Sequence, residues 1–464
     1  MNDPITLPRW LLVLLLMLSA WAVVALMLLP GIRWWFRRRA NRVIDEINQR
    51  LRIRLQPFKL TKREVLIDRL THDEQVLAET ESMAAAEGIE PELLRARVET
   101  YAREIVPSFN AYAYFRIGYR MARRILRLSY RVRLGSVDRG PLEGLPEDAA
   151  VVFVMNHRSN ADYLLVSYLV ADSTALSYAV GEWARIWPLS HLMRSMGAYF
   201  VRRRSRDGLY RKVLERYVAM ATESGVTQAV FPEGGLTRNG SLGEARKGLL
   251  RYLVMAHESG ARNVVFVPVG LNYDRVLEDR RQLNTGEGKT PGKLYTLLST
   301  ASFIANQCWL FVTRRWYRFG YAAVNFGRPL HLADWIAEDE LPSPAPDEDT
   351  LRQRVDLVSD EIMHRIGEAV PALCVPLVAE VLLTTTKPLT ALELEAAVQQ
   401  RITAIEAAGG KVRVPREDRS YAVQVGLRML KLRNLVQENA GLYEHVPAER
   451  ALLDYYARSI EHFA

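Results

Sequence analysis

The middle of the chain alternates between short, strongly apolar runs and longer stretches with helical periodicity. The apolar runs between residues 148 and 330 are AAVVFVM, ALSYAV, GAYFV, VTQAVF, NVVFVPVG and YAAVNF. Helix-like segments such as 208–224 and 243–258 separate several of them. Unbroken, β-branched strands are typical of a sheet that is covered on both faces. The pattern therefore predicts an α/β domain whose mostly parallel sheet is covered by helices.

Helical periodicity flanks this domain on both sides. Residues 58–134 read as helical, and apolar side chains after Pro91 recur at spacings of four, three and four. A turn-rich linker, LPSPAPDED, precedes a C-terminal region that is also mostly helical. We expect four parts: a transmembrane anchor in 1–32, a helical region in 33–140, an α/β catalytic domain in 141–340 and a helical region in 341–464.

A long apolar run lies near the N-terminus. Leu11–Leu29 is 19 residues long with Ser19 as its only polar side chain, enough for a helix to cross a bilayer core of about 30 Å. Arginines crowd its C-terminal flank, which predicts that the following chain is cytoplasmic. A cleaved signal peptide is the alternative, because Ala20-Trp21-Ala22 resembles a cleavage site, but the charges then lie on the wrong side. We expect a single uncleaved span in the inner (cytoplasmic) membrane.

The charge of the chain is positive and unevenly distributed. Lys and Arg number 62 against 53 Asp and Glu, which gives a net charge of +9. Between Ile105 and Val137 there are seven arginines and no acid, interleaved with aromatic and aliphatic residues. This segment either lies on an anionic membrane surface or forms a solvated face beside a packed core. We expect membrane contact for this segment. We expect no nucleic-acid partner, because nucleic-acid-binding modules are absent.

Motifs for several other chemistries are missing. GEGKT at 286–290 resembles the end of a phosphate-binding loop, but Leu283 occupies the position of the required glycine and no strand precedes it. A G-x-S-x-G nucleophile motif and metal-spaced histidines are absent. Cys308 and Cys374 lie in apolar surroundings and form no metal-spaced pair. We expect neither a metal nor a cofactor.

A polar cluster, NHRSNAD, follows the first of the strand-like runs at 156–162. His157 would leave the strand, and Asp162 would lie in the first turn of the next helix, where a carboxylate is favoured. The loop can return the carboxylate to the imidazole, which fixes one ring nitrogen as N–H and leaves the other as a base. The nucleophile would then be a substrate hydroxyl. The alternative is a structural histidine with a helix-capping aspartate.

Polar clusters also follow three other strand-like runs, as GAYFVRRR, VFPEGGLTRNG and VFVPVGLNYDRV. Ligands bind at the carboxyl ends of parallel strands, so the clusters predict one shared site. A tight turn at Glu233-Gly234-Gly235 can direct backbone N–H groups at an anion. Arginine suits phosphate because its guanidinium is planar, although each cation taken singly is equally a surface charge. The candidate cations are Arg203, Arg238 and Lys247.

These clusters resemble the four blocks of the phospholipid/glycerol acyltransferase superfamily, and most closely those of the membrane-bound glycerol-3-phosphate 1-O-acyltransferases. The matching segments are NHRSNADYLL with its H-x4-D spacing, GAYFVRR, FPEGGLTRNG and VFVPVGLNYDRV. The resemblance extends over roughly residues 80–464, and it includes VNFGRPLHL and a C-terminal Tyr455-Tyr456 followed by His462. Leu236 and Thr237 depart from the third block, which usually has Arg and Ser there.

The resemblance implies a reaction and a role for each candidate residue. His157, oriented by Asp162, would take the proton of the 1-hydroxyl of glycerol 3-phosphate, whose oxygen attacks the thioester of acyl-CoA or acyl-acyl carrier protein. Lysophosphatidic acid would be the product. Arg203, Arg238 and Lys247 would bind the phosphate, Glu233, Gly234 and Gly235 would form the oxyanion and substrate loop, and Pro268 would line the acyl or substrate pocket.

Two other functions remain open at this point. The departure at Leu236 favours a lysophosphatidic acid or other lysolipid as the acceptor. A catalytically silent protein that binds lipid or carrier protein at the membrane is the more distant alternative, and the intact pair of His157 and Asp162 argues against it.

Overall fold

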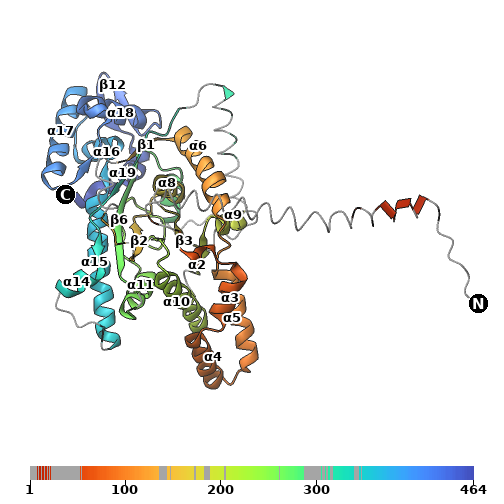
Figure 1. Ribbon diagram of the computed structural model, residues 1–464. Coiled ribbons are helices and arrows are strands. Elements are labelled where there is room, and N and C mark those ends of the chain that lie inside the picture. Colours follow the sequence, from red (N-terminus) through yellow and green to blue (C-terminus); the bar gives the residue numbers. More distant parts are fainter. Residues whose placement is uncertain are drawn as a thin grey trace, which may run out of the picture. The chain divides into compact units, whose positions relative to one another are not determined.

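A computed structural model of the chain shows the arrangement of its elements (Figure 1). It describes residues 55–134, 148–171, 174–181, 189–202, 205–260, 262–286, 317–338 and 347–463, with isolated positions elsewhere. Residues 1–54 and 55–464 form two compact units, and the fold below is that of the second. Most of the predicted anchor Leu11–Leu29 lies outside the described residues. Within the described part of the chain, no helix is both long and apolar enough to span a bilayer.

A mixed but mostly parallel sheet forms the centre of the second unit, as the sequence predicts. Among the described residues its order is β1-β7-β6-β2-β5-β3-β4, and β8 pairs with β6. The pairs of β6 with β7 and β8 are antiparallel and the other pairs are parallel. The strands are β1 (Arg131–Leu134), β2 (Ala150–Met155), β3 (Ser177–Val180), β4 (Ala198–Phe200), β5 (Gln228–Val230), β6 (Val264–Tyr273), β7 (Tyr321–Phe326) and β8 (Leu330–His331).

Helices cover this sheet because its strands are apolar on both faces. All six residues of β2 and all ten of β6 are buried. One face of β2, with Val152 and Val154, shares a hydrophobic core with α10 (Gly208–Glu223), α11 (Lys247–Glu258) and α15 (Glu348–Ala369). Figure 1 shows these three helices together beside β2 and β6. The helix predicted at 208–224 is confirmed as α10, and the helix predicted at 243–258 is α11, which begins later, at Lys247.

The region before the sheet is helical, with one exception. Its elements are α2 (Pro57–Leu60), α3 (Arg63–Thr71), α4 (Glu74–Glu87), α5 (Pro91–Ile105), the π-helix η1 (Ala113–Gly118) and α6 (Tyr119–Ser129). The apolar periodicity after Pro91 is the buried face of α5, which includes Leu94, Val98 and Ile105. Residues 131–134, which the sequence assigned to the helical region, instead form β1 and pair with β7.

The C-terminal region packs several helices around α16 (Cys374–Thr384). These are α17 (Ala391–Ala407), α18 (Arg419–Lys431) and α19 (Arg450–Ala457). Two small sheets accompany them, which the sequence did not predict: β11 (Lys411–Val412) with β9 (Pro371–Ala372), and β10 (Leu389–Thr390) with β13 (Leu442–His445) and β12 (Val436–Asn439). Strands of two to four residues are too short to show an alternating pattern.

The polar clusters meet at one edge of the sheet, as predicted. Strands β2, β4, β5 and β6 all run in the same direction, since β2 is parallel to β5 and β6, and β3 is parallel to β4 and β5. Their carboxyl ends therefore share an edge, and the four clusters follow or include those ends.

Candidate active site

His157 and Asp162 form a buried pair at the carboxyl end of β2. The strand ends at Met155, and Asp162 is the first residue of α8 (Asp162–Val170). The loop between them brings Nδ1 of His157 to 2.9 Å from Oδ2 of Asp162. The His157 side chain is 2% exposed and the Asp162 side chain is completely buried. The contact that the spacing predicted is thus present.

The Asp162 carboxylate is held by further donors, which fix its position. Its Oδ2 also accepts from the backbone N–H groups of Arg158 at 2.7 Å and Ser159 at 2.9 Å. Its Oδ1 accepts from the hydroxyl of Tyr273 at 2.6 Å. Burial and the charge of Asp162 raise the pKa of Tyr273 well above its ordinary value, so this hydroxyl stays protonated and donates. Because the Asp162 oxygens accept hydrogen bonds from these donors, Nδ1 of His157 is assigned as the N–H that donates to Oδ2, which leaves Nε2 as the basic nitrogen.

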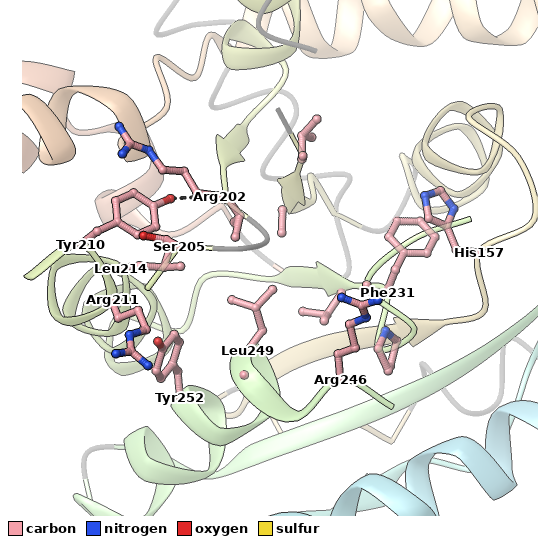
Figure 2. A pocket seen from close by; sticks show the side chains of 18 of the residues that line it. His157, Arg202, Ser205, Tyr210, Arg211, Leu214, Phe231, Arg246, Leu249 and Tyr252 are labelled. Atoms are coloured by element: carbon pink, nitrogen blue, oxygen red, sulfur yellow. Dashed lines mark hydrogen bonds between the residues drawn. The ribbon is translucent and has the colours of Figure 1, made fainter. Parts of the chain in front are cut away.

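His157 lines a pocket of about 220 Å³, which is drawn in Figure 2. Nε2 of His157 has no hydrogen-bond partner among the described residues. The ring stacks against Phe231 with the centroids 4.0 Å apart, and Tyr163 packs edge-on to it at 5.6 Å. These aromatic contacts hold the imidazole against one wall while its basic nitrogen stays available.

The described lining of this pocket is positively charged and apolar. It contains Arg202, Arg211 and Arg246, several tyrosine and aliphatic side chains, and no Asp or Glu. In Figure 2, Arg246 lies toward the end of the pocket that holds His157, and Arg202 and Arg211 lie toward the other end. Such a lining favours a ligand with an anionic group and an apolar portion.

The three arginines differ in how far their charge is already neutralised. Arg202 forms two hydrogen bonds to the carboxylate of Glu104, at 2.6 and 2.9 Å. Among the described residues, the one hydrogen bond that the Arg211 side chain donates is to the backbone carbonyl of Arg206, at 3.4 Å. Arg246 is exposed and has no acidic partner among the described side chains. Arg246 and Arg211 are therefore better able to bind an anion than Arg202.

The Glu233-Gly234-Gly235 turn links the loop at His157 to the loop at Gly243 through the Glu233 carboxylate. Oε1 of Glu233 accepts from the backbone N–H of His157 at 2.7 Å, and Oε2 accepts from that of Gly243 at 3.0 Å. Burial raises the pKa of Glu233, and these N–H groups oppose the shift. Gly234 has a φ of +65°, and a side chain there would meet Cδ of Arg246 at 2.5 Å. The glycine thus lets Arg246 fold across the turn.

The backbone donors of this turn are not equivalent. The N–H of Gly234 donates to the carbonyl of Phe231 at 2.9 Å, so it is engaged within the turn. The N–H of Gly235 has no partner among the described residues. Of the two glycines, Gly235 is therefore the one with a donor left for an oxyanion, and that role stays a prediction.

The predicted phosphate ligands are placed differently from one another. Arg203 lies outside the described residues. Arg238 is exposed and Lys247 forms an ion pair with Asp356 at 2.6 Å, and neither lines the pocket. Pro268 is buried in β6 opposite Val154, also away from the described lining. Their roles in binding stay predictions.

Sequence reasoning missed the arginines that do line the pocket. Arg202 stands next to Arg203 in a run of three, so only its position in that run distinguishes it. Arg211 is on α10, and Arg246 is the residue before α11. No motif marks either position, and only the packing of these helices against the strand ends brings both to the pocket.

The C-terminal region holds the H-x4-D loop in place. Arg158 is 2% exposed, and its guanidinium donates to the carbonyls of Gly240 and, at 3.1 Å, of Ser459. Gln282 donates to the carbonyl of Arg158 at 3.0 Å and accepts from Tyr455 at 2.6 Å. Residues 240 and 282, together with the C-terminal residues 455 and 459, therefore fix the backbone next to His157.

A close approach of two backbones completes this arrangement. Gly240 has a φ of +92°, and a side chain there would lie 1.8 Å from the carbonyl oxygen of Tyr455. Tyr456 donates to Asp279 at 2.5 Å and accepts from the N–H of Val276 at 3.1 Å. The Tyr-Tyr pair noted in the sequence thus connects α19 to the segment that follows β6.

Among the described residues, no group of three or more His, Cys, Asp or Glu side chains is arranged as a metal site. The chemistry assembled at the strand ends is a histidine base with its carboxylate partner, beside an arginine-lined pocket.

Two family models match the sequence over most of these elements. The model described as "Acyltransferase" matches residues 139–272, and "Glycerol-3-phosphate acyltransferase C-terminal region" matches residues 307–464. The chain is therefore similar to the glycerol-3-phosphate acyltransferases over these residues. The resemblance drawn from the four sequence blocks is thereby confirmed.

Curated relatives carry the same description. The chain is 28% identical over 362 residues to a glycerol-3-phosphate acyltransferase of Xanthomonas axonopodis pv. citri, covering 75% of this chain and 40% of that protein. It is 25% identical over 386 residues to one from Pseudoalteromonas atlantica, covering 80% of this chain and 46% of that protein. The chain thus spans less than half the length of these relatives.

A solved structure is also similar to part of the chain. It is a 1-acyl-sn-glycerophosphate (LPA) acyltransferase from Thermotoga maritima, with a TM-score of 0.31 and 16% identity over 65% of this chain and 96% of that one. The fold described above rests on the strands and helices of this chain.

Proposed function

We propose that this protein transfers a fatty acyl group from acyl-CoA or acyl-acyl carrier protein to the 1-hydroxyl of glycerol 3-phosphate. Nε2 of His157 takes the proton of the hydroxyl as its oxygen attacks the thioester carbonyl. The C–S bond then breaks and the thiol leaves, with the proton returned from the imidazolium. The products are lysophosphatidic acid and the free thiol.

The observation that carries this proposal is the setting of His157. A histidine with Nδ1 held by a buried carboxylate and Nε2 without a protein partner is the base-and-orienter part of a triad. The described pocket lining has no protein nucleophile beside it other than hydroxyl groups such as that of Ser205, which Figure 2 places toward the far end. A substrate hydroxyl therefore fills the role of the nucleophile, as the relatives' description also suggests.

The acceptor's phosphate is its only charged group, so the pocket cations decide where it binds. Arg246 lies toward the His157 end and has no acidic partner among the described residues. A phosphate beside Arg246 would place the acceptor at the same end of the pocket as the imidazole. The remainder of the pocket contains tyrosine and aliphatic side chains as well as Arg202 and Arg211, and its apolar part is suited to the acyl chain of the donor.

We also propose that the protein acts at the inner membrane, with the predicted span at Leu11–Leu29 as its anchor and the main body in the cytoplasm. The product has one long acyl chain and an anionic head, so a membrane-bound enzyme can release it directly into the bilayer.

The test is a thiol-release assay on the purified full chain with a panel of acceptors. Acyl-CoA and acyl-acyl carrier protein are each offered with glycerol 3-phosphate, with lysophosphatidic acid and with no acceptor, and products are identified by mass spectrometry. We expect thiol release that depends on glycerol 3-phosphate. Release that depends on lysophosphatidic acid alone would establish the lysolipid alternative, and no release with any acceptor would support a silent binding protein.

A matched pair of variants links the activity to the proposed base. His157→Ala should lower the rate of transfer by about 10²–10⁴-fold, and His364→Ala, which removes an exposed histidine on α15, should leave it unchanged. Equal activity in the two variants would remove His157 from the mechanism.

A further inference from the structure

Arginine and tyrosine side chains gather at one edge of the sheet, outside the described lining of the pocket. Arg131 and Tyr321 are the first residues of β1 and β7, and they are partners in the register of these two strands. The guanidinium carbon of Arg131 lies 5.8 Å from the centre of the Tyr321 ring, and Nη1 donates to the Tyr321 hydroxyl at 3.5 Å. Arg133 is on the same side of β1 and lies 5.8 Å from the same ring.

Two residues of the C-terminal region join this group. Hydrogen bonding to Tyr321, and a further interaction with the hydroxyl of Tyr421 on α18, raise the pKa of Arg131. Arg416, in the turn before α18, places its guanidinium 4.8 Å from the centre of the Tyr421 ring. The backbone of Arg416 has a φ of +60°, a strained conformation for a residue with a side chain, and such strain is frequent at binding sites. We call Arg131, Arg133, Tyr321, Arg416 and Tyr421 the arginine–tyrosine cluster.

The three arginines of the arginine–tyrosine cluster carry charge that is not neutralised by the described side chains. All three are exposed, and none of them pairs with a carboxylate among the described residues. The nearby Asp418 is engaged as the N-cap of α18, where it accepts from the N–H of Tyr421 at 3.0 Å. A guanidinium stacked on a tyrosine ring is held in place while its N–H edge stays free for phosphate oxygens. The cluster therefore suits a ligand with several phosphate groups.

The arginine–tyrosine cluster and the pocket lie on opposite sides of His157 along the same edge. β6 ends at Tyr273 beside the start of β7, so β7 and its parallel neighbour β1 begin at the edge where β2 ends. In the order β2-β6-β7-β1, the start of β1 is three strand spacings from β2, which is about 14 Å. The pocket runs the other way, past Phe231 after β5 and Val180 of β3 to Val201 after β4.

This separation matches the length of one class of acyl donor. In acyl-CoA, about thirteen bonds separate the thioester sulfur from the first phosphate, or roughly 16 Å when the arm is extended. We propose that the arginine–tyrosine cluster binds the phosphates of CoA while the thioester lies at His157. The inference rests on the proposed function, and it directs the acyl chain into the pocket and the CoA arm away from it. It favours CoA over a carrier protein, because CoA carries a diphosphate and a 3′-phosphate whereas the arm of the carrier carries a single phosphate.

The first test is calorimetric titration of the full chain with free CoA, which requires no acyl transfer. Arg133→Gln and Arg416→Gln should each weaken CoA binding by about fivefold, as expected for an exposed charge pair. Arg419→Gln is the matched control and should bind CoA like wild type, because Arg419 follows closely in the chain but already pairs with Glu406 at 2.6 Å. Arg416→Gly should lose the same affinity and melt no lower than Arg416→Gln, because glycine adopts a positive φ freely.

The second test compares two donors that differ only in the nucleotide. Arg133→Gln and Arg416→Gln should lower kcat/KM for acyl-CoA by about the same fivefold. They should leave kcat/KM for the corresponding acyl-pantetheine unchanged, because that donor has no phosphate for the arginine–tyrosine cluster to bind. A purely structural role of these arginines would lower kcat/KM for both donors.

Two outcomes would overturn the proposal. Equal CoA affinity in wild type, Arg133→Gln and Arg416→Gln would show that the phosphates of CoA bind elsewhere. Adenosine 3′,5′-bisphosphate that binds through these arginines without competing with CoA would assign the cluster to a free nucleotide. Retained, arginine-dependent CoA binding in a protein that transfers no acyl group would instead contradict the proposed reaction and leave this site standing.

Discussion

The hydroxyl of Tyr273 donates to Oδ1 of Asp162 at 2.6 Å, on the side of the carboxylate opposite to His157. Tyr273 is the last residue of β6 and Asp162 the first of α8, so the two come from segments 111 residues apart. Asp162 shares its charge between this hydroxyl and the imidazole. In the proposed reaction, Tyr273 is therefore a positioning residue that would act on His157 through Asp162.

Tyr273→Phe should move the acid limb of the kcat/KM profile to higher pH by on the order of one unit. Without the hydroxyl, the carboxylate holds the protonated imidazole more tightly, and His157 must be neutral to act. The pH profile of kcat/KM measures this. Tyr130→Phe is the control, because its hydroxyl bonds the carbonyl of Arg275 and not Asp162. An unchanged acid limb would show that Tyr273 serves packing alone.

His157→Ala should lower kcat by about 10²–10⁴-fold while the protein still folds, because a lost general base has that effect. Steady-state thiol release measures the rate, and circular dichroism with a thermal melt checks the fold. Activity within a few-fold of wild type would assign proton transfer to another group.

Arg246→Ala should raise the KM for glycerol 3-phosphate by about one to two decades and leave the KM for the acyl donor nearly unchanged. A charge-assisted hydrogen bond contributes about 1.5–3 kcal/mol, and the phosphate is the acceptor's only charged group. Arg246→Lys should rescue poorly, because lysine lacks the planar fork.

Arg203→Ala and Arg238→Ala complete this comparison, because the sequence predicts that these residues also bind the phosphate. Arg238 is exposed and lies outside the described pocket lining. We therefore expect Arg238→Ala to raise the KM for glycerol 3-phosphate less than Arg246→Ala does. An acceptor KM that rises for Arg238→Ala and not for Arg246→Ala would place the phosphate outside this pocket.

Arg158→Lys should lower both stability and kcat, since lysine cannot reach the carbonyls of Gly240 and Ser459 together. An unsatisfied buried carbonyl costs about 1–3 kcal/mol, and the loop next to His157 loses its anchor. Thermal melts and kcat measure the two effects. Arg458→Lys is the control, since Arg458 forms an exposed pair with Asp454 in the same C-terminal segment. Equal effects of the two substitutions would contradict a role for Arg158 in bracing the loop.

Ionisation of Asp274 should lower the free energy of unfolding of the protein as the pH rises from about 4 to about 6. Burial raises the pKa of Asp274 to about 6, against the backbone N–H groups of Tyr321 and Val375 that lower it. In this window the folded chain binds more protons than the unfolded chain, so the free energy of unfolding falls with pH, by about 3 kcal/mol in all.

Urea unfolding on either side of this window measures the effect. Asp274→Asn cannot titrate and should remove the share of the fall that Asp274 contributes, although it gives up one backbone hydrogen bond. The exposed Asp360 on α15 provides the control, and Asp360→Asn should retain the wild-type dependence. The same fall with pH in Asp274→Asn would trace it to other groups.

The sequence determined the central sheet and the contact between His157 and Asp162 because both depend on short-range pattern. Apolar runs such as Val151–Met155 predict buried strands wherever they pack, and the five-residue step from His157 to Asp162 spans one loop, whose ends the backbone keeps close. Their common direction then brings four polar clusters to one edge.

Only the tertiary structure decided which other residues join that pair. Tyr273 reaches Asp162, Arg246 folds over Gly234, and Arg158 bonds Ser459 because β6, α11 and the C-terminal segment pack beside β2. Sequence separations of up to 301 residues leave no periodic signal for such contacts. The same reason separates Arg202, Arg211 and Arg246 in the pocket lining from Arg238 and Lys247 outside it, because a cation's position along the chain does not determine which surface it faces.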